Sequence, residues 1–104
     1  MYKICFYVPE SHLEKVKGAL FVAGAGRIGH YDRCSWQCLG EGQFRPLAGS
    51  QPALGQQDVV ESIAEYKVEL VCSDEDIHAA LAALKTSHPY EEPAFDVVRV
   101  IDSF

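Results

Sequence analysis

Four side chains with metal-ligating chemistry stand at even-numbered positions of one stretch. His30, Asp32, Cys34 and Cys38 would project from one side of an extended strand, because side chains alternate along a strand. Imidazole and thiolate groups bind zinc and copper, so a divalent metal is the cofactor that this set predicts. Since a strand rises about 3.3 Å per residue, one ion cannot reach every same-side position, and further ligands must come from elsewhere. The candidates are Cys5, Cys72, His88 and Glu91. The alternative is that the cysteines act as small apolar residues.

A second unusual stretch, His88–Pro93, reads HPYEEP. One imidazole followed by two carboxylates could ligate a cation or carry out acid–base chemistry. The alternative is a rigid turn in which the prolines restrict the backbone, Tyr90 anchors the turn and both glutamates lie in solvent. The residue types favour the turn.

The segment Gly24–Gly29, GAGRIG, matches the pattern G-x-G-x-x-G. In a dinucleotide-binding loop this pattern follows a strand and opens a helix, whose free N–H groups meet the phosphates. Here it follows a predicted helix and precedes a predicted strand, so it indicates a helix cap and a tight turn. Glycine-rich backbone can still form an anion-binding nest, which makes Gly26, Arg27 and Gly29 candidate ligand-binding residues.

These residues are positioned by a framework with two similar halves, each a strand, a helix and a strand. Strands are indicated by alternation of apolar residues and helices by apolar spacings of three and four. A serine followed three residues later by an acidic residue predicts each helix start. The expected elements are a strand over 2–8, a helix from Ser11 to near Gly24, a strand over 30–39, a strand within 59–72, a helix from Ser73 to before Pro89, and a strand over 94–101.

The stretch Gly24–Gly55 holds seven of the eight glycines. Within it, residues 40–42 predict a turn and residues 43–47 a returning strand, so we expect a hairpin there. The two halves predict a single α+β domain over residues 1–104, ferredoxin-like (β-α-β-β-α-β), with an extra glycine-rich hairpin or loop. Both helices should cover one face of the sheet. Because the strands are apolar on both sides, the other face is expected to pack against further copies of the chain.

Composition excludes several classes of function. The net charge of −6 argues against binding to nucleic acid or to an anionic membrane, since both attract basic surfaces. No apolar run is long enough to span a membrane, and the N-terminus does not resemble a secretion signal. The four cysteines are therefore expected to be reduced thiols in the cytoplasm. No Walker loop, G-x-S-x-G or H-E-x-x-H motif occurs, so the sequence predicts no enzyme.

The two unusual stretches together resemble a known family. GAGRIGHYDRCSWQCLGEGQFRPLAGSQPALG resembles the YqfO domain, an insert of NIF-three-like proteins that also occurs alone, and HPYEEPAFDV resembles the end of the same domain. HPYEEP is also similar to the corresponding turn of CutA proteins. The resemblance spans essentially the whole chain and implies a CutA/PII-like fold that commonly assembles as a trimer. The longer relatives bind two metal ions in flanking halves that these residues do not include, so their hydrolase or GTP-cyclohydrolase names are not implied here.

We therefore expect a non-enzymatic, homotrimeric binding or regulatory module of the PII/CutA type. A small ligand is expected at subunit clefts near the Gly24–Gly29 turn, Arg45 and the turn after the second helix. Its candidate residues are Gly26, Arg27, Gly29, Arg45, His88 and Glu91. The alternative is a CutA-type divalent-metal binder, using zinc or copper, whose candidates are His30, Cys34, Cys38, His88 and Glu91. A third hypothesis, a small enzyme using His88, Glu91 and Glu92, lacks a nucleophile.

Overall fold

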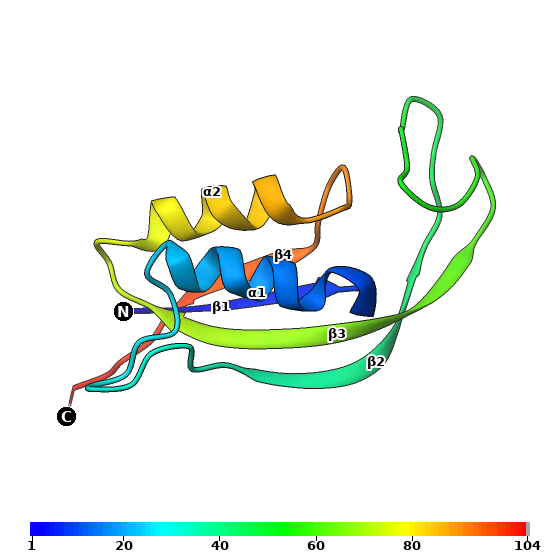
Figure 1. Ribbon diagram of the computed structural model, residues 1–104. Coiled ribbons are helices and arrows are strands. Elements are labelled where there is room, and N and C mark those ends of the chain that lie inside the picture. Colours follow the sequence, from blue (N-terminus) through cyan, green and yellow to red (C-terminus); the bar gives the residue numbers. More distant parts are fainter. Residues whose placement is uncertain (104) are drawn as a thin grey trace.

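The computed structural model, which describes residues 1–103, is a four-stranded antiparallel sheet with both helices on one face (Figure 1). The strand order is β2-β3-β1-β4. This is the ferredoxin-like arrangement that the two similar halves predict. In chain order the elements are β1 (Tyr2–Val8), a short 3-10 helix (Glu10–His12), α1 (Leu13–Val22), β2 (Trp36–Phe44), β3 (Glu61–Cys72), α2 (Ile77–Ser87) and β4 (Phe95–Arg99).

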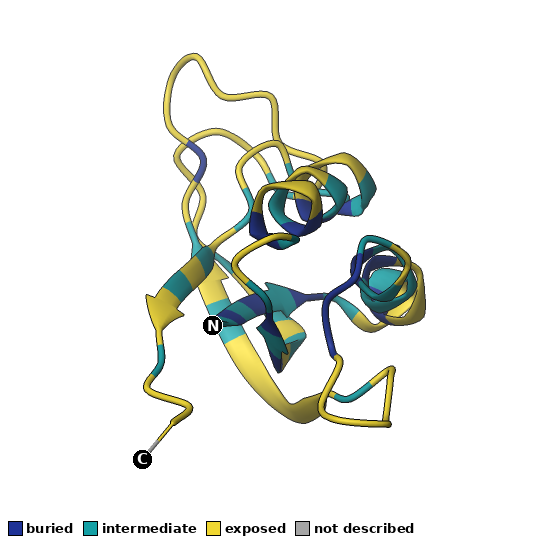
Figure 2. Ribbon diagram, turned by 90° about the vertical axis from the view of Figure 1, so that its left-hand side faces the viewer, coloured by how far each residue is buried: buried dark blue, intermediate teal, exposed yellow. Residues whose placement is uncertain are grey.

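The core lies between the sheet and the helices, and strand alternation builds it. Ile4, Phe6 and Val8 turn the same way along β1 and are fully buried. Burial of each such side chain stabilises the fold by about 1.5–3 kcal/mol. Figure 2 shows the buried residues gathered between the sheet and the helices, while β2 and the long loop beyond it are mostly exposed. The helices contribute Leu13, Val16, Leu20, Ile77, Ala80 and Leu84.

The two predicted helix starts have different outcomes. At the second, the N–H of Asp76 donates to Ser73 Oγ at 3.3 Å, and α2 begins at the next residue. At the first, Ser11 caps nothing: its hydroxyl lies 2.9 Å from His12 Nδ1, and α1 begins at Leu13 without a side-chain cap. The reason is a 3-10 turn closed by the His12 N–H on the Pro9 carbonyl, which precedes the helix.

The prediction of a hairpin inside the glycine-rich stretch was wrong. Strand β2 runs without a break through residues 40–42, and its pairing with β3 continues to Phe44 opposite Glu61. The true hairpin is formed by β2 and β3, which are joined by residues 45–60. Pairing with β3 gives Gly40 and Gly42 ladder partners, and this outweighs the local preference of glycine for turns. At Gly42 the Glu65 carboxylate occupies the space that a Cβ would take.

The strand expected over 30–39 begins only at Trp36. Before it, residues 24–35 form a loop in which Arg33 has a left-handed backbone, with φ of 55°. Hydrogen bonds close this loop: the Gly26 N–H donates to the Val71 carbonyl at 2.7 Å, and the Cys34 N–H to the Gly26 carbonyl at 2.8 Å.

The sheet face opposite the helices is uncovered in a single chain (Figure 1). Alternation directs Cys5 and Tyr7 of β1 to this face, and the register sets Lys67 beside Tyr7. Strand β2 adds Trp36 and Cys38, and the Trp36 side chain is 58% exposed. This face is therefore a mixed apolar and charged surface.

Met1 and Val100, near the two ends of the described chain, lie side by side. The N–H of Val100 donates to the Met1 carbonyl at 3.0 Å, extending the pairing of β1 with β4. Within residues 1–103, no helix has the length and apolar character needed to cross a membrane.

Candidate ligand site

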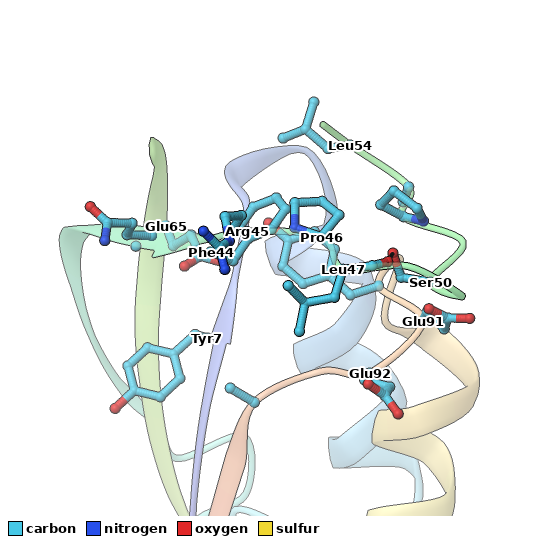
Figure 3. A pocket seen from close by; sticks show the side chains of 16 residues that line it. Tyr7, Phe44, Arg45, Pro46, Leu47, Ser50, Leu54, Glu65, Glu91 and Glu92 are labelled. Carbon is cyan, nitrogen blue, oxygen red and sulfur yellow. Dashed lines mark hydrogen bonds between the residues drawn. The ribbon is translucent and has the colours of Figure 1, made fainter. Parts of the chain in front are cut away.

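A cavity of about 520 Å³ lies where the 45–60 loop meets the turn after α2 (Figure 3). Its size is within the range of about 300–1,000 Å³ that is typical of small-molecule sites. In Figure 3, Leu47 and Ser50 of the loop stand on one side, and Glu91 and Glu92 of the turn on the other. The apolar lining includes Phe44, Pro46, Leu47, Leu54 and Ala94, and the polar lining includes Arg45, Ser50, Glu65, Tyr90, Glu91 and Glu92.

The turn beneath the cavity is held by His88, whose side chain is only 6% exposed. The Tyr90 N–H donates to Nδ1 at 3.1 Å, so the proton of the neutral ring lies on Nε2, which donates to the Tyr7 carbonyl at 2.6 Å. Burial lowers the pKa of His88, and this keeps the ring neutral. With both nitrogens in use, His88 ties the turn to β1 and has no lone pair left for a metal.

Tyr90 stands between His88 and the cavity. Its ring centroid is 4.8 Å from that of His88 and 6.3 Å from that of Phe44. Its hydroxyl oxygen is buried and has no hydrogen-bond partner within the described residues. Burial raises the pKa of Tyr90 to about 12, and the nearby Glu65 carboxylate contributes to this rise. The carboxylate and the hydroxyl do not meet in hydrogen-bond geometry. A buried hydroxyl without a partner costs about 1–3 kcal/mol, and a bound molecule that reached it from the cavity would recover part of this cost.

The loop over the cavity is folded on itself and attached to the turn. Ser50 donates through its hydroxyl to the Leu47 carbonyl at 2.7 Å, and the Asp58 N–H donates to the Pro46 carbonyl at 2.6 Å. The N–H of Gln51 donates to Glu91 Oε1 at 3.1 Å. This bond joins residues 40 positions apart and closes one side of the cavity.

The structure divides the predicted ligand-binding residues between opposite ends of β3. Arg45 and Glu91 line the cavity, and His88 supports it from behind Tyr90. Gly26, Arg27 and Gly29 belong to the loop that is bonded to Val71, near the far end of that strand. A single chain therefore does not bring the Gly24–Gly29 turn together with Arg45.

The predicted metal ligands are not brought together either. His30 and Cys34 do not share a strand face with Cys38, because the strand begins only at Trp36. Among residues 1–103, no group of three or more His, Cys, Asp or Glu side chains is placed to hold a metal ion. The cysteines are free thiols, and Cys38 is exposed.

Sequence reasoning missed most of the residues that line the cavity as ligand contacts, Glu65 and Tyr90 among them. The sequence pattern does indicate the orientation of Glu65, because the alternation of β3 places it on the same sheet face as Lys67 and Glu69. Tyr90 was expected only as a structural anchor of the turn. Its second role depends on the loop that folds back over it, which no local pattern indicates.

The fold and the cavity define the class of this chain as a CutA/PII-like, ferredoxin-like α+β domain with a ligand-sized cavity at one end. No protein-family model matches the chain. It is 44% identical over 99 residues to a Mycobacterium leprae protein named GTP cyclohydrolase 1 type 2 homolog, covering 95% of this chain and 26% of that one. A Bacillus subtilis protein of the same name is 40% identical over 98 residues, again over 26% of its length.

Solved structures agree with these matches. A Bacillus cereus protein related to NIF3 has a TM-score of 0.78 and 36% identity, over 92% of this chain and 24% of that one. CutA from Archaeoglobus fulgidus has a TM-score of 0.70 and 14% identity, over 100% of this chain and 88% of that one, which shows the fold alone. The resemblance to NIF-three-like proteins is thus confirmed, and the resemblance to CutA proteins is confirmed for the fold. The chain spans about a quarter of the length of the curated relatives it matches.

Proposed function

We propose that this chain is a non-enzymatic binding or regulatory module that takes a small molecule into the cavity between the 45–60 loop and the turn after α2. The observation that carries the proposal is the cavity of about 520 Å³, which Tyr90 and Glu65 line together with apolar side chains of the loop. An apolar cavity with a few convergent polar groups is the usual form of a small-molecule site. The similarity to CutA and NIF3-related structures supports a module of this kind.

The groups around the cavity are suited to binding rather than to covalent catalysis. The Ser50 hydroxyl donates to the Leu47 carbonyl, whereas an activated nucleophile would donate to a base. The imidazole of His88 has both nitrogens engaged by the backbone. The name of the relatives, GTP cyclohydrolase 1 type 2 homolog, belongs to proteins of which this chain matches only 26%.

We further propose that copies of the chain associate as a homotrimer through the open sheet face. The exposed Trp36 beside Cys38 on this face supports the proposal. Light scattering at micromolar concentration should give three chain masses for the wild type. Trp36→Glu should lower that mass, whereas Val22→Glu, a change at an 84% exposed position on α1, should not. A monomeric wild type would remove the trimer proposal.

Binding in the cavity is tested by a fragment screen on the 15N-labelled chain, read from amide chemical shifts. Ala94 lines the cavity and is exposed, so Ala94→Trp should fill the cavity without entering the core. Ala82→Trp, at an exposed position on α2, is the matched control. We expect compounds that shift the amides of Tyr90 and Ser50 in the wild type and the control, but not in Ala94→Trp. If no compound behaves in this way, the proposed function is refuted.

A further inference from the structure

Negatively charged side chains outnumber positively charged ones around the cavity. Three carboxylates line it, those of Glu65, Glu91 and Glu92, against the single guanidinium of Arg45. Arg45, Glu91 and Glu92 are exposed, so water screens them. Glu65 is half-buried, and in the described part of the chain it forms no salt bridge. A partly desolvated carboxylate without a cationic partner favours the arrival of a cation.

Aromatic rings supply a second attraction for a cation. The rings of Phe44 and Tyr90 lie 6.3 Å apart and tilted by 46° in the cavity wall, and Tyr7 also lines the cavity. A cation over an aromatic face is attracted by the negative side of the ring quadrupole. Elsewhere the chain fills such positions itself, as where Arg99 lies 4.4 Å above the Tyr2 ring. Over Phe44 and Tyr90, no Lys or Arg of the described chain does so.

The Tyr90 hydroxyl is a third group that could interact with a cation. Its oxygen can accept a hydrogen bond as well as donate one, so it offers an acceptor near the Glu65 carboxylate to an ammonium group that reaches it from the cavity. An incoming anion would meet the same three carboxylates with only Arg45 to offset them.

We infer that the cavity binds a small organic cation, with an ammonium group against Glu65 and the aromatic rings and an apolar body against Pro46, Leu47 and Leu54. A nucleotide or other polyanion is the ligand that this arrangement disfavours. The inference rests on the proposed function of the cavity and narrows it to one class of ligand.

The test is an amide-shift titration of the full 15N-labelled chain with three probes: phenethylamine, its neutral isostere 2-phenylethanol, and ATP. Phenethylamine should shift the amides of Gly42, Glu65 and Tyr90, and should bind about tenfold more tightly than the alcohol, as expected from one hydrogen bond to a charged group. ATP should leave the chemical shifts of these amides unchanged.

Substitutions show whether the preference for the amine over the alcohol arises in the cavity. Glu65→Gln should lower the affinity for phenethylamine about tenfold, to that of the alcohol. Glu75→Gln, at an exposed acidic residue lining the hollow at the other end of the molecule, should have no effect. Tyr90→Phe removes one acceptor without changing the charge, so it should weaken phenethylamine more than the alcohol. This second variant keeps the test decisive if Glu65→Gln disturbs the fold.

The outcomes separate the two claims. Equal affinity for the amine and the alcohol, or binding of ATP in the cavity, overturns the cationic ligand and leaves a small-molecule site standing. If none of the three probes shifts the cavity amides while the fragment screen finds compounds blocked by Ala94→Trp, only the inference about charge fails. If the screen also finds none, the proposed function fails with it.

Discussion

Replacing His88 with alanine tests whether the imidazole holds the turn beneath the cavity. The change removes two hydrogen bonds, from Nε2–H to the Tyr7 carbonyl at 2.6 Å and from the Tyr90 N–H to Nδ1 at 3.1 Å. It leaves two main-chain groups unpaired around a side chain that is 6% exposed. Each buried group left without a partner costs about 1–3 kcal/mol, so the free energy of unfolding should fall by about 2–4 kcal/mol once some water has entered.

The assay is equilibrium unfolding in urea at neutral pH and fixed protein concentration, because self-association makes apparent stability depend on concentration. His78→Ala is the matched control, since His78 is exposed on α2, and it should change the unfolding free energy by less than about 0.5 kcal/mol. In thermal unfolding, each kcal/mol lost should lower Tm by about 4–8 °C in a domain of this size.

The reasoning is refuted if His88→Ala costs no more than His78→Ala. In that case the turn is held by its prolines, and the imidazole is free for another role. His88→Gln is a second test of the two hydrogen bonds, because an amide can donate and accept but does not match the geometry of the ring. Its stability should lie between those of the wild type and His88→Ala.

Three further outcomes are expected. Because burial lowers the pKa of His88, the unfolded chain takes up a proton at higher pH than the folded chain, so stability is fully present above pH about 6.5 and is lost as pH falls below it. Urea unfolding from neutral to acidic pH should show this loss in the wild type and a smaller one in His88→Gln. Tyr90→Phe should leave the unfolding free energy unchanged or raise it by up to about 1 kcal/mol, because the hydroxyl has no partner in the described chain; a clear loss by calorimetry would mean that it has one. Ser73→Ala should cost about 1 kcal/mol by removing the hydrogen bond that Ser73 Oγ accepts from the Asp76 N–H just before α2. Ser11→Ala, tested in the same urea series, should cost less than half of that, and equal costs would contradict the difference between the two helix starts.

The regular part of the fold could be predicted because its patterns are local. Val68 and Leu70 alternate with Lys67 and Glu69 along β3, and this alternation places the buried face correctly. The path of β2 could not be predicted in the same way. Its pairing with β3 spans a long connection, and local glycine chemistry points to a turn where the ladder in fact continues.

The site was predictable only in part, for the same reason. Arg45 and Glu91 stand out by type and position and do line the cavity. The contribution of Tyr90 depends on the loop that Gln51 ties to the turn 40 residues later, and such a contact has no periodicity to reveal it. Gly26 belongs to the other end of the sheet because its N–H is bonded to Val71.

The hydrogen bond between Val100 and Met1 has a consequence for how this fold can be rearranged. Strand β1 begins beside the end of β4, so a peptide of a few residues would join Val100 to Met1 without deforming either strand. The chain can then be reopened within the exposed 45–60 loop to give a circular permutant with the same core. By the same geometry, a longer protein can carry residues 1–100 as an insert at a single surface position. This is compatible with the relatives, in which the matching segment is about a quarter of the length.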